Sequence, residues 1–161
     1  MSWSRAALVL LVMRVTLACA QQYGFTQYTP KDGLAQSQVR CIGQDTSGHL
    51  WLGTLGGASS FDGHAFTSYA LQEGLPDAQV NALLGARDGT MWLCAGGSLV
   101  AVRGKQRRII ALPSESHDAR LLAIAELPDG DLLLGTDGAG LFRFDGHAFS
   151  RRAALPSDAA C

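Results

Sequence analysis

The stretch that decides the fold lies at residues 45–57, which read DTSGHLWLGTLGG. Asp45 and Gly48 are typical of a tight turn, because an Asp side chain accepts hydrogen bonds from nearby backbone amides and Gly readily takes a positive φ. Residues 49–54 form a largely apolar run around Trp51, of the length of a short strand. Gly56 and Gly57 then end the run. We therefore expect a turn, a strand and a second turn here.

The same pattern returns twice, each time 41 residues further along the chain. Trp51 is followed at this step by Trp92 and Leu133, and four other columns keep the same step. Those columns are Val39, Val80 and Leu121; Ile42, Leu83 and Ile124; Gly48, Gly89 and Gly130; and Gly56, Gly97 and Gly138. A repeat of about 40–50 residues with short strands is typical of β-propeller blades.

A second marker is the hexapeptide FDGHAF, which stands at residues 61–66 and again at residues 144–149. Its Asp-Gly pair predicts a tight hairpin before the last strand of the copy. The hexapeptides are 83 residues apart, two periods plus one, and the extra residue falls in the glycine turn at 138–140. Such an insertion is ordinary in a surface turn.

Each copy divides into four strands, which predicts an all-β fold: a β-propeller with about three four-stranded blades in an incomplete ring. We expect propeller structure over residues 21–161. Within it we expect an outer strand at 24–28, blades at 39–69, 80–112 and 120–152, and the start of a next blade at 154–161. A four-stranded sheet has two apolar faces and needs neighbouring sheets to cover them.

That need places a large residue at one point of every copy, so Trp51, Trp92 and Leu133 are expected to pack between blades. Stacking against a sugar is the alternative role for the two tryptophans. Three blades do not close a ring, which leads us to expect a fragment or a natural truncation. The expected partners are the missing blades or downstream sensor domains, together with an unknown small ligand, for which carbohydrate is one candidate.

Composition excludes several function classes. Apolar residues make up 47% of the 161-residue chain and the net charge is -1, which gives no general attraction to nucleic acid or to an anionic membrane. One basic cluster stands out, formed by Arg103, Lys105, Arg107 and Arg108 around Gly104. We interpret it as a solvated hairpin, with a specific anion site as the alternative.

The first twenty residues resemble an export signal. Arg5 precedes an apolar run at residues 6–17, and Ala18, Cys19 and Ala20 follow as a small-residue cleavage site. We expect a signal peptide at residues 1–20, cleavage after Ala20 and a periplasmic product; a lipoprotein signal ending in Cys19 is the rival. The run is short for a membrane span.

No catalytic, cofactor or metal site is predicted. Cys41, Cys94 and Cys161 have no paired spacing and are expected as small buried residues rather than as a disulfide. Asp62 and Asp145 are expected as turn residues. The histidines stand at scattered repeat positions, namely His49, His64, His117 and His147. Three serines lack the sequence context of a catalytic nucleophile, namely Ser59, Ser60 and Ser68. The ligand-binding residues stay unknown at this stage.

The repeat resembles the two-component regulator propeller, whose core is D-x-x-G-x-[LIV]-W-[IVL]-G-T followed by a glycine turn and an aromatic residue. Residues 45–57 match it closely; the second copy has Cys94 and Ala95 in place of Gly-Thr, and the third has Leu133 in place of the Trp. The resemblance covers roughly residues 23–155. Propellers with WD repeats or quinone cofactors share the architecture but not this motif.

The resemblance implies the periplasmic ligand-sensing region of a bacterial signal transduction receptor. In such receptors the output domain, a histidine kinase or a diguanylate cyclase, follows a membrane helix, and the chain contains neither. We therefore expect no enzyme activity. Two alternatives remain open: a secreted propeller enzyme such as a polysaccharide lyase, and a truncated gene product without function.

Overall fold

The computed structural model describes residues 24–116 and 118–152. In these residues the chain forms three four-stranded antiparallel sheets and three short 3-10 helices, which confirms the all-β prediction and the three blades. The described strands close no ring. The helices are η1 (Pro30–Asp32), η2 (Leu71–Glu73) and η3 (Ser114–Ser116).

Each sheet runs in chain order, so every strand pairs with the one before it through a short turn. Sheet A contains β1 (Val39–Gln44), β2 (Leu50–Thr54), β3 (Ala58–Phe61) and β4 (Phe66–Tyr69). Sheet B contains β5 (Val80–Gly85), β6 (Met91–Ala95), β7 (Ser98–Arg103) and β8 (Gln106–Ala111). Sheet C contains β9 (Leu121–Glu126), β10 (Leu132–Thr136), β11 (Leu141–Phe144) and β12 (Phe149–Arg152).

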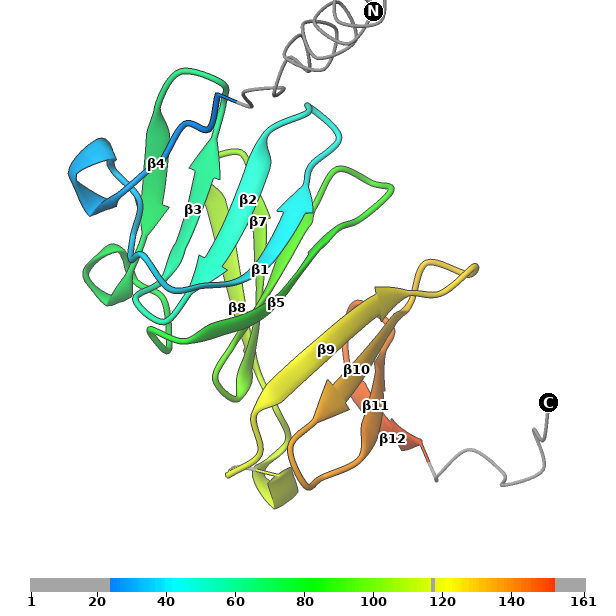
Figure 1. Ribbon diagram of the computed structural model, residues 1–161. Helices are drawn as coiled ribbons and strands as arrows, with labels where there is room; N and C mark the ends of the chain where they lie inside the picture. The colour runs from blue at the N-terminus through cyan, green and yellow to red at the C-terminus, as the bar shows by residue number, and fades with distance from the viewer. Residues whose placement is uncertain (1–23, 117, 153–161) are drawn as a thin grey trace, which may run out of the picture.

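The three sheets fan out from their first strands (Figure 1). Strand β5 contacts both β1 and β9, whereas β4, β8 and β12 lie at the outer edges of the sheets (Figure 1). Sheet B therefore lies between sheets A and C and is covered on both faces. This is the arrangement of propeller blades around an axis next to the first strands.

Two apolar clusters hold the sheets together. Strand alternation points Met91 and Leu93 of β6 into the cluster between sheets A and B, which also includes Trp51. The same alternation points Cys94 into the cluster between sheets B and C, where Phe144 is fully buried. Burial of this apolar surface on both faces of sheet B is the main force that stacks the blades.

The first strand of each sheet carries an irregularity at the same place. The pairing register shifts at Arg40 in β1, at Asn81 in β5 and at Leu122 in β9, positions that keep the 41-residue step. A bulge adds one unpaired residue and increases the local twist of the strand. At the second bulge the Asn81 side-chain amide donates to the carbonyl oxygen of Leu121 at 3.0 Å, which ties sheet B to sheet C.

The predicted contacts between blades hold for the two tryptophans. Trp51 is 5% exposed and belongs to the cluster between sheets A and B. Trp92 is partly buried and packs against the cluster between sheets B and C. Leu133 belongs to neither described cluster. Its side of sheet C faces no further sheet in the described part of the chain, so the third contact did not form.

Residues 24–28 do not form the predicted outer strand. They pair with no strand of the described chain, and an extended segment counts as a strand only when it pairs with another. Instead the Tyr28 ring lies against Phe61 and Phe66 of sheet A, with centroids 5.2 and 5.3 Å away. The predicted signal peptide at residues 1–20 and the predicted next blade at 154–161 lie outside the described residues.

Candidate ligand-binding clefts between the blades

The turns that join the first to the second strand and the third to the fourth strand lie at one end of each sheet. Their glycines take the positive φ that these tight turns need, for example 98° at Gly63. Asp62 accepts hydrogen bonds from the amides of His64 and Ala65, both at 2.8 Å. Asp145 repeats the arrangement with His147 and Ala148. Both carboxylates are turn residues, as predicted, and these backbone hydrogen bonds lower the pKa of each.

The histidines do not meet. His49, His64 and His147 lie in or beside separate turns, and His117 lies outside the described residues. His49 Nδ1 lies 3.5 Å from an Asp45 carboxylate oxygen. Within residues 24–116 and 118–152, no group of three or more His, Cys, Asp and Glu side chains could hold a metal ion.

Two of the three serines, Ser59 and Ser68, have structural contacts. Ser59 is fully buried; its hydroxyl accepts a hydrogen bond from the Ala35 amide at 2.8 Å and lies 3.2 Å from the Ser68 hydroxyl. These bonds fix the loop before β1 onto sheet A. Cys41 and Cys94 are free thiols. Burial raises the pKa of Cys94 to about 12, so it is protonated and unreactive at neutral pH.

A first cleft, of about 320 Å³, opens between sheets A and B. The Trp51 ring stacks on Tyr69 with centroids 5.2 Å apart, and the Trp51 indole N–H donates to an Asp45 carboxylate oxygen at 2.9 Å. Burial raises the pKa of Asp45, but hydrogen bonds from Trp51, His49 and Ser47 outweigh it and the pKa is lowered. The indole N–H of Trp51 and the carboxylate of Asp45 are thus paired with each other in this cleft.

A second cleft, of about 550 Å³, opens between sheets B and C. This volume is within the range of small-molecule sites, roughly 300–1,000 Å³. Its wall is the face of sheet B that carries Trp92, Arg103 and Arg108, and the turn of sheet C closes it at Gly146. Asp88 also lines it, but its carboxylate accepts hydrogen bonds from the amide and the hydroxyl of Thr90, both at 2.9 Å.

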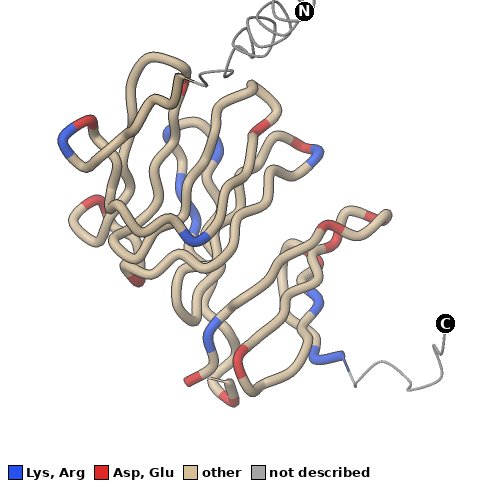
Figure 2. The backbone as a smooth tube through the Cα atoms, viewed as in Figure 1, with Lys and Arg blue, Asp and Glu red and all other residues tan. Residues whose placement is uncertain are grey.

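The basic cluster is the exposed β7–β8 hairpin, as predicted, and Figure 2 shows it as blue stretches along sheet B. The strand register divides it between two clefts. Arg107 pairs with Val102 and turns toward sheet A, where it lies 5.8 Å from the Tyr69 ring centroid and donates to the carbonyl of Glu73. Arg103 and Arg108 face sheet C.

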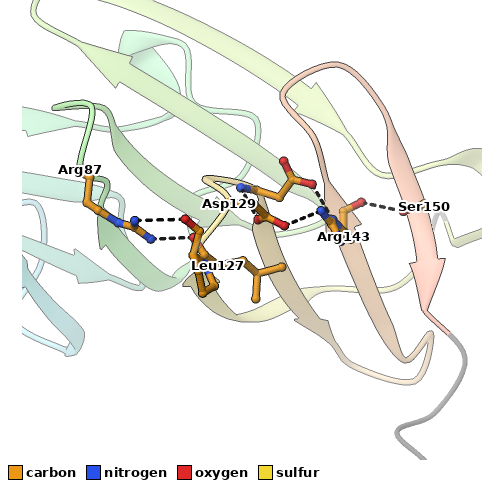
Figure 3. Close-up of polar contacts among 7 residues, drawn as sticks. Arg87, Leu127, Asp129, Arg143 and Ser150 are labelled. Carbon is orange, nitrogen blue, oxygen red and sulfur yellow. Dashed lines mark hydrogen bonds and ion pairs between the residues drawn. The ribbon is translucent and has the colours of Figure 1, made fainter.

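A polar clamp joins sheets B and C at the same end (Figure 3). The Arg87 guanidinium reaches across to the first turn of sheet C, where it donates to the Leu127 carbonyl at 2.6 Å and lies 3.3 Å from Glu126. On sheet C itself, Arg143 lies between the carboxylates of Asp129 and Asp131 (Figure 3). The Arg87 contacts thus link sheet B to the first turn of sheet C.

Sequence reasoning left the ligand-binding residues unknown, and the structure brings Trp92, Arg103 and Arg108 together. Two signals in the sequence point to this site. The first is that Arg103 and Arg108 fall on the same face of the sheet once the hairpin turn is placed at Gly104. The second signal is Ala86, which stands in the column where the first copy has Asp45.

The family model described as "Two component regulator propeller" matches residues 33–56. Residues 33–56 are a two-component regulator propeller repeat. The repeat contains the turn, the strand around Trp51 and the glycine that ends it, and the other two sheets repeat its architecture.

One relative is a protein named Histidine kinase P4, from Formosa agariphila. It is 55% identical over 40 residues, which are 25% of this chain and 3% of that protein. The chain therefore spans a very small part of this relative, and the match does not extend to the activity of the whole protein.

Solved structures share the fold. The extracellular domain of the hybrid two-component system BT3049 from B. thetaiotaomicron has a TM-score of 0.64 at 23% identity, over 77% of this chain and 18% of that one. The extracellular domain of BT4673 from the same organism has a TM-score of 0.71 at 17% identity, over 88% of this chain and 20% of that one. The chain spans about a fifth of each.

Virginiamycin B lyase from Staphylococcus aureus also has this fold, with a TM-score of 0.60 at 24% identity over 74% of this chain and 42% of the lyase. Identities this low show the propeller architecture alone, because one fold serves many functions. In the described part of the chain, no helix is long and apolar enough to cross a membrane.

Proposed function

We propose that this chain supplies three blades of a periplasmic ligand-sensing propeller in a bacterial signal transduction receptor, and that it acts by binding rather than by catalysis. The observation that carries the proposal is the regulator-propeller repeat at residues 33–56, repeated as three stacked sheets. Solved neighbours that are extracellular domains of such systems support it.

Binding takes place in the clefts between the blades, at the end where the short turns gather. A cleft between two sheets suits sensing, because a ligand that contacts both sheets favours one relative position of the blades and so shifts a conformational equilibrium. Carbohydrate is the ligand class that we propose, since Trp92 presents part of its ring to the cleft between sheets B and C.

Export belongs to the same proposal. Residues 1–20 act as a signal peptide that is cleaved after Ala20. Mass spectrometry of the chain recovered from a bacterial periplasm tests this step. The expected mature N-terminus is Gln21; a product that retains Met1, or one lipidated at Cys19, contradicts it.

Further blades complete the ring. Apolar side chains on the first strands, such as Ile42 at 65% exposed and Leu122 at 46% exposed, give other blades or downstream sensor domains a surface to pack on. These partners belong to the same receptor or to a second protein chain.

The competing function is a secreted propeller lyase, which the fold shared with virginiamycin B lyase brings into consideration. One experiment separates the two. Soluble oligosaccharides are titrated against the purified chain by calorimetry, and the same mixtures are then analysed for unsaturated products. Saturable binding without product supports the sensor. Product formation supports the lyase, and neither binding nor product contradicts carbohydrate sensing.

A further inference from the structure

The cleft between sheets B and C differs in chemistry from its counterpart between sheets A and B. Cross-strand pairing places Trp51, Ser60 and Thr67 in one row across sheet A. The equivalent row of sheet B contains Trp92, Ala101 and Arg108. The same architecture thus carries a neutral row in one blade and a row with a cation in the next.

The indole N–H groups of the two tryptophans also differ. In sheet A the Trp51 N–H is used by Asp45. In sheet B the position equivalent to Asp45 is Ala86, which has no acceptor. The Trp92 N–H has no hydrogen-bond partner among the described residues, and Trp92 lines the cleft. A donor that has no protein partner, on a residue that lines a cleft, is available to a ligand.

Arg103 and Arg108 add charge to this wall. Arg103 donates to the Asp88 carbonyl and Arg108 to the Gly146 carbonyl, both at 3.1 Å. These contacts orient each guanidinium and leave further N–H groups free, since a guanidinium has five. Neither arginine has a carboxylate within 4.0 Å in the described structure, whereas Arg143 of sheet C has two.

The cleft is therefore lined by hydrogen-bond donors and by part of an aromatic ring. Arg103 and Arg108 carry two positive charges on the face toward sheet C, and the Asp88 carboxylate in the same lining accepts hydrogen bonds from Thr90. Arginine binds carboxylate and sulfate oxygens well because its planar N–H groups match their geometry. An aromatic face next to the cations suits the apolar side of a sugar ring.

We propose that the cleft between sheets B and C binds an acidic saccharide, with its carboxylate or sulfate ester between Arg103 and Arg108 and its ring against Trp92. This inference rests on the proposed carbohydrate sensing and narrows its substrate class. Carboxylate and sulfate share the chemistry that arginine recognises, so both are included in the test.

The experiment is calorimetric titration of the exported chain with four probes. Galacturonate oligosaccharides carry only carboxylates, carrageenan oligosaccharides carry sulfate esters, cello-oligosaccharides are neutral, and inorganic sulfate is an anion without a ring. Arg103→Gln and Arg108→Gln are each expected to weaken binding of an acidic probe about tenfold. Lys105→Gln is the matched control, because it removes the same charge from the same hairpin outside this cleft and should change affinity less than about twofold.

A second readout locates the ligand. In a ¹⁵N-labelled chain the indole N–H resonance of Trp92 should move on titration, while that of Trp51, already bonded to Asp45, should not. Equal binding of neutral and acidic probes, unchanged in the arginine variants, would overturn the acidic-saccharide inference and leave carbohydrate sensing intact. Sulfate that competes as strongly as the oligosaccharides would also overturn it. If no saccharide binds, the proposed carbohydrate sensing is contradicted as well.

Discussion

At the scale of single residues, equivalent positions of the repeat carry different tasks. Trp51 and Trp92 stand in one column, yet Trp51 is nearly fully buried with its N–H bonded, and Trp92 is partly exposed with its N–H unpaired. The difference in hydrogen bonding follows from one difference at another repeat position, Asp45 against Ala86. The role of Trp51 is packing between blades, whereas Trp92 both packs between blades and has an indole N–H that a ligand can reach.

Replacing Trp51 by Phe should destabilise the chain by about 1–3 kcal/mol, because it removes a buried hydrogen bond and leaves a cavity. The matched change Trp92→Phe should cost about 1 kcal/mol or less, since its N–H makes no bond to the described chain. Equilibrium urea unfolding of the two variants measures both costs. Equal losses would show that the Asp45 contact contributes nothing.

Asp45 should also contribute to the pH dependence of stability. Its pKa is lowered in the folded chain, so its stabilising contribution is present above the unfolded pKa and is lost as pH falls through the folded pKa. We expect the stability gap between the unchanged chain and Asp45→Asn to shrink between about pH 5 and pH 2.5. Urea unfolding across this range checks it, and a gap that is constant with pH contradicts it.

The buried thiol gives a chemical test. Cys94 is fully buried with its pKa raised to about 12, so it should resist iodoacetamide at about pH 8 in the folded chain and react in urea. Peptide mass spectrometry reports the extent of labelling. Cys41, which is only partly buried, is the internal comparison and should react faster. Similar rates for the two thiols would contradict the packing of β6.

At the scale of elements, the first strands of neighbouring sheets lie so close together that the size of their side chains limits the distance between them. Gly85 at the end of β5 faces the Gln44 carbonyl at the end of β1, and a Cβ there would overlap that oxygen. Gly43 of β1 has room, because a Cβ would lie 3.5 Å from the Cβ of Leu83. The spacing of the blades next to the axis thus depends on particular glycines.

Gly85→Ala should therefore cost about 1–3 kcal/mol, because the overlapping atom is backbone and β1 and β5 must separate. Gly43→Ala, in the neighbouring first strand, should stay within about 0.5 kcal/mol of the unchanged chain. Thermal and urea unfolding of the pair give both values. A Gly85→Ala chain as stable as the Gly43→Ala chain would show that the blades separate at no cost.

At the scale of the whole molecule, sheet B is covered on both faces, whereas sheets A and C each have one face without a neighbouring sheet in the described structure. In the described chain, strands β6 and β7 contain five of the eleven largest fully buried side chains: Met91, Leu93, Cys94, Leu99 and Val100. Stability should therefore decrease from the middle sheet toward both outer sheets.

Hydrogen exchange followed by mass spectrometry tests this gradient. Amides of β6 and β7 should exchange most slowly, and those of β4 and β12 markedly faster, since exchange reports the local free energy of opening. Addition of a ligand that contacts sheets B and C should slow exchange in β7, β8 and the turn at Gly146 more than in β2. A uniform exchange rate across the three sheets would contradict the predicted decrease in stability from sheet B to sheets A and C.

The amino-acid sequence by itself determined the repeat, the turns and most strands, because a period of 41 residues, Asp-Gly hairpins and apolar runs act locally. It also implied that Trp51 lies between blades. Only the tertiary structure decided which blade face each arginine joins, that the third large residue stays outside the clusters, and that residues 24–28 form no strand. Those outcomes depend on cross-strand register and on whether a partner sheet lies alongside, and both are long-range properties that no single stretch of sequence specifies.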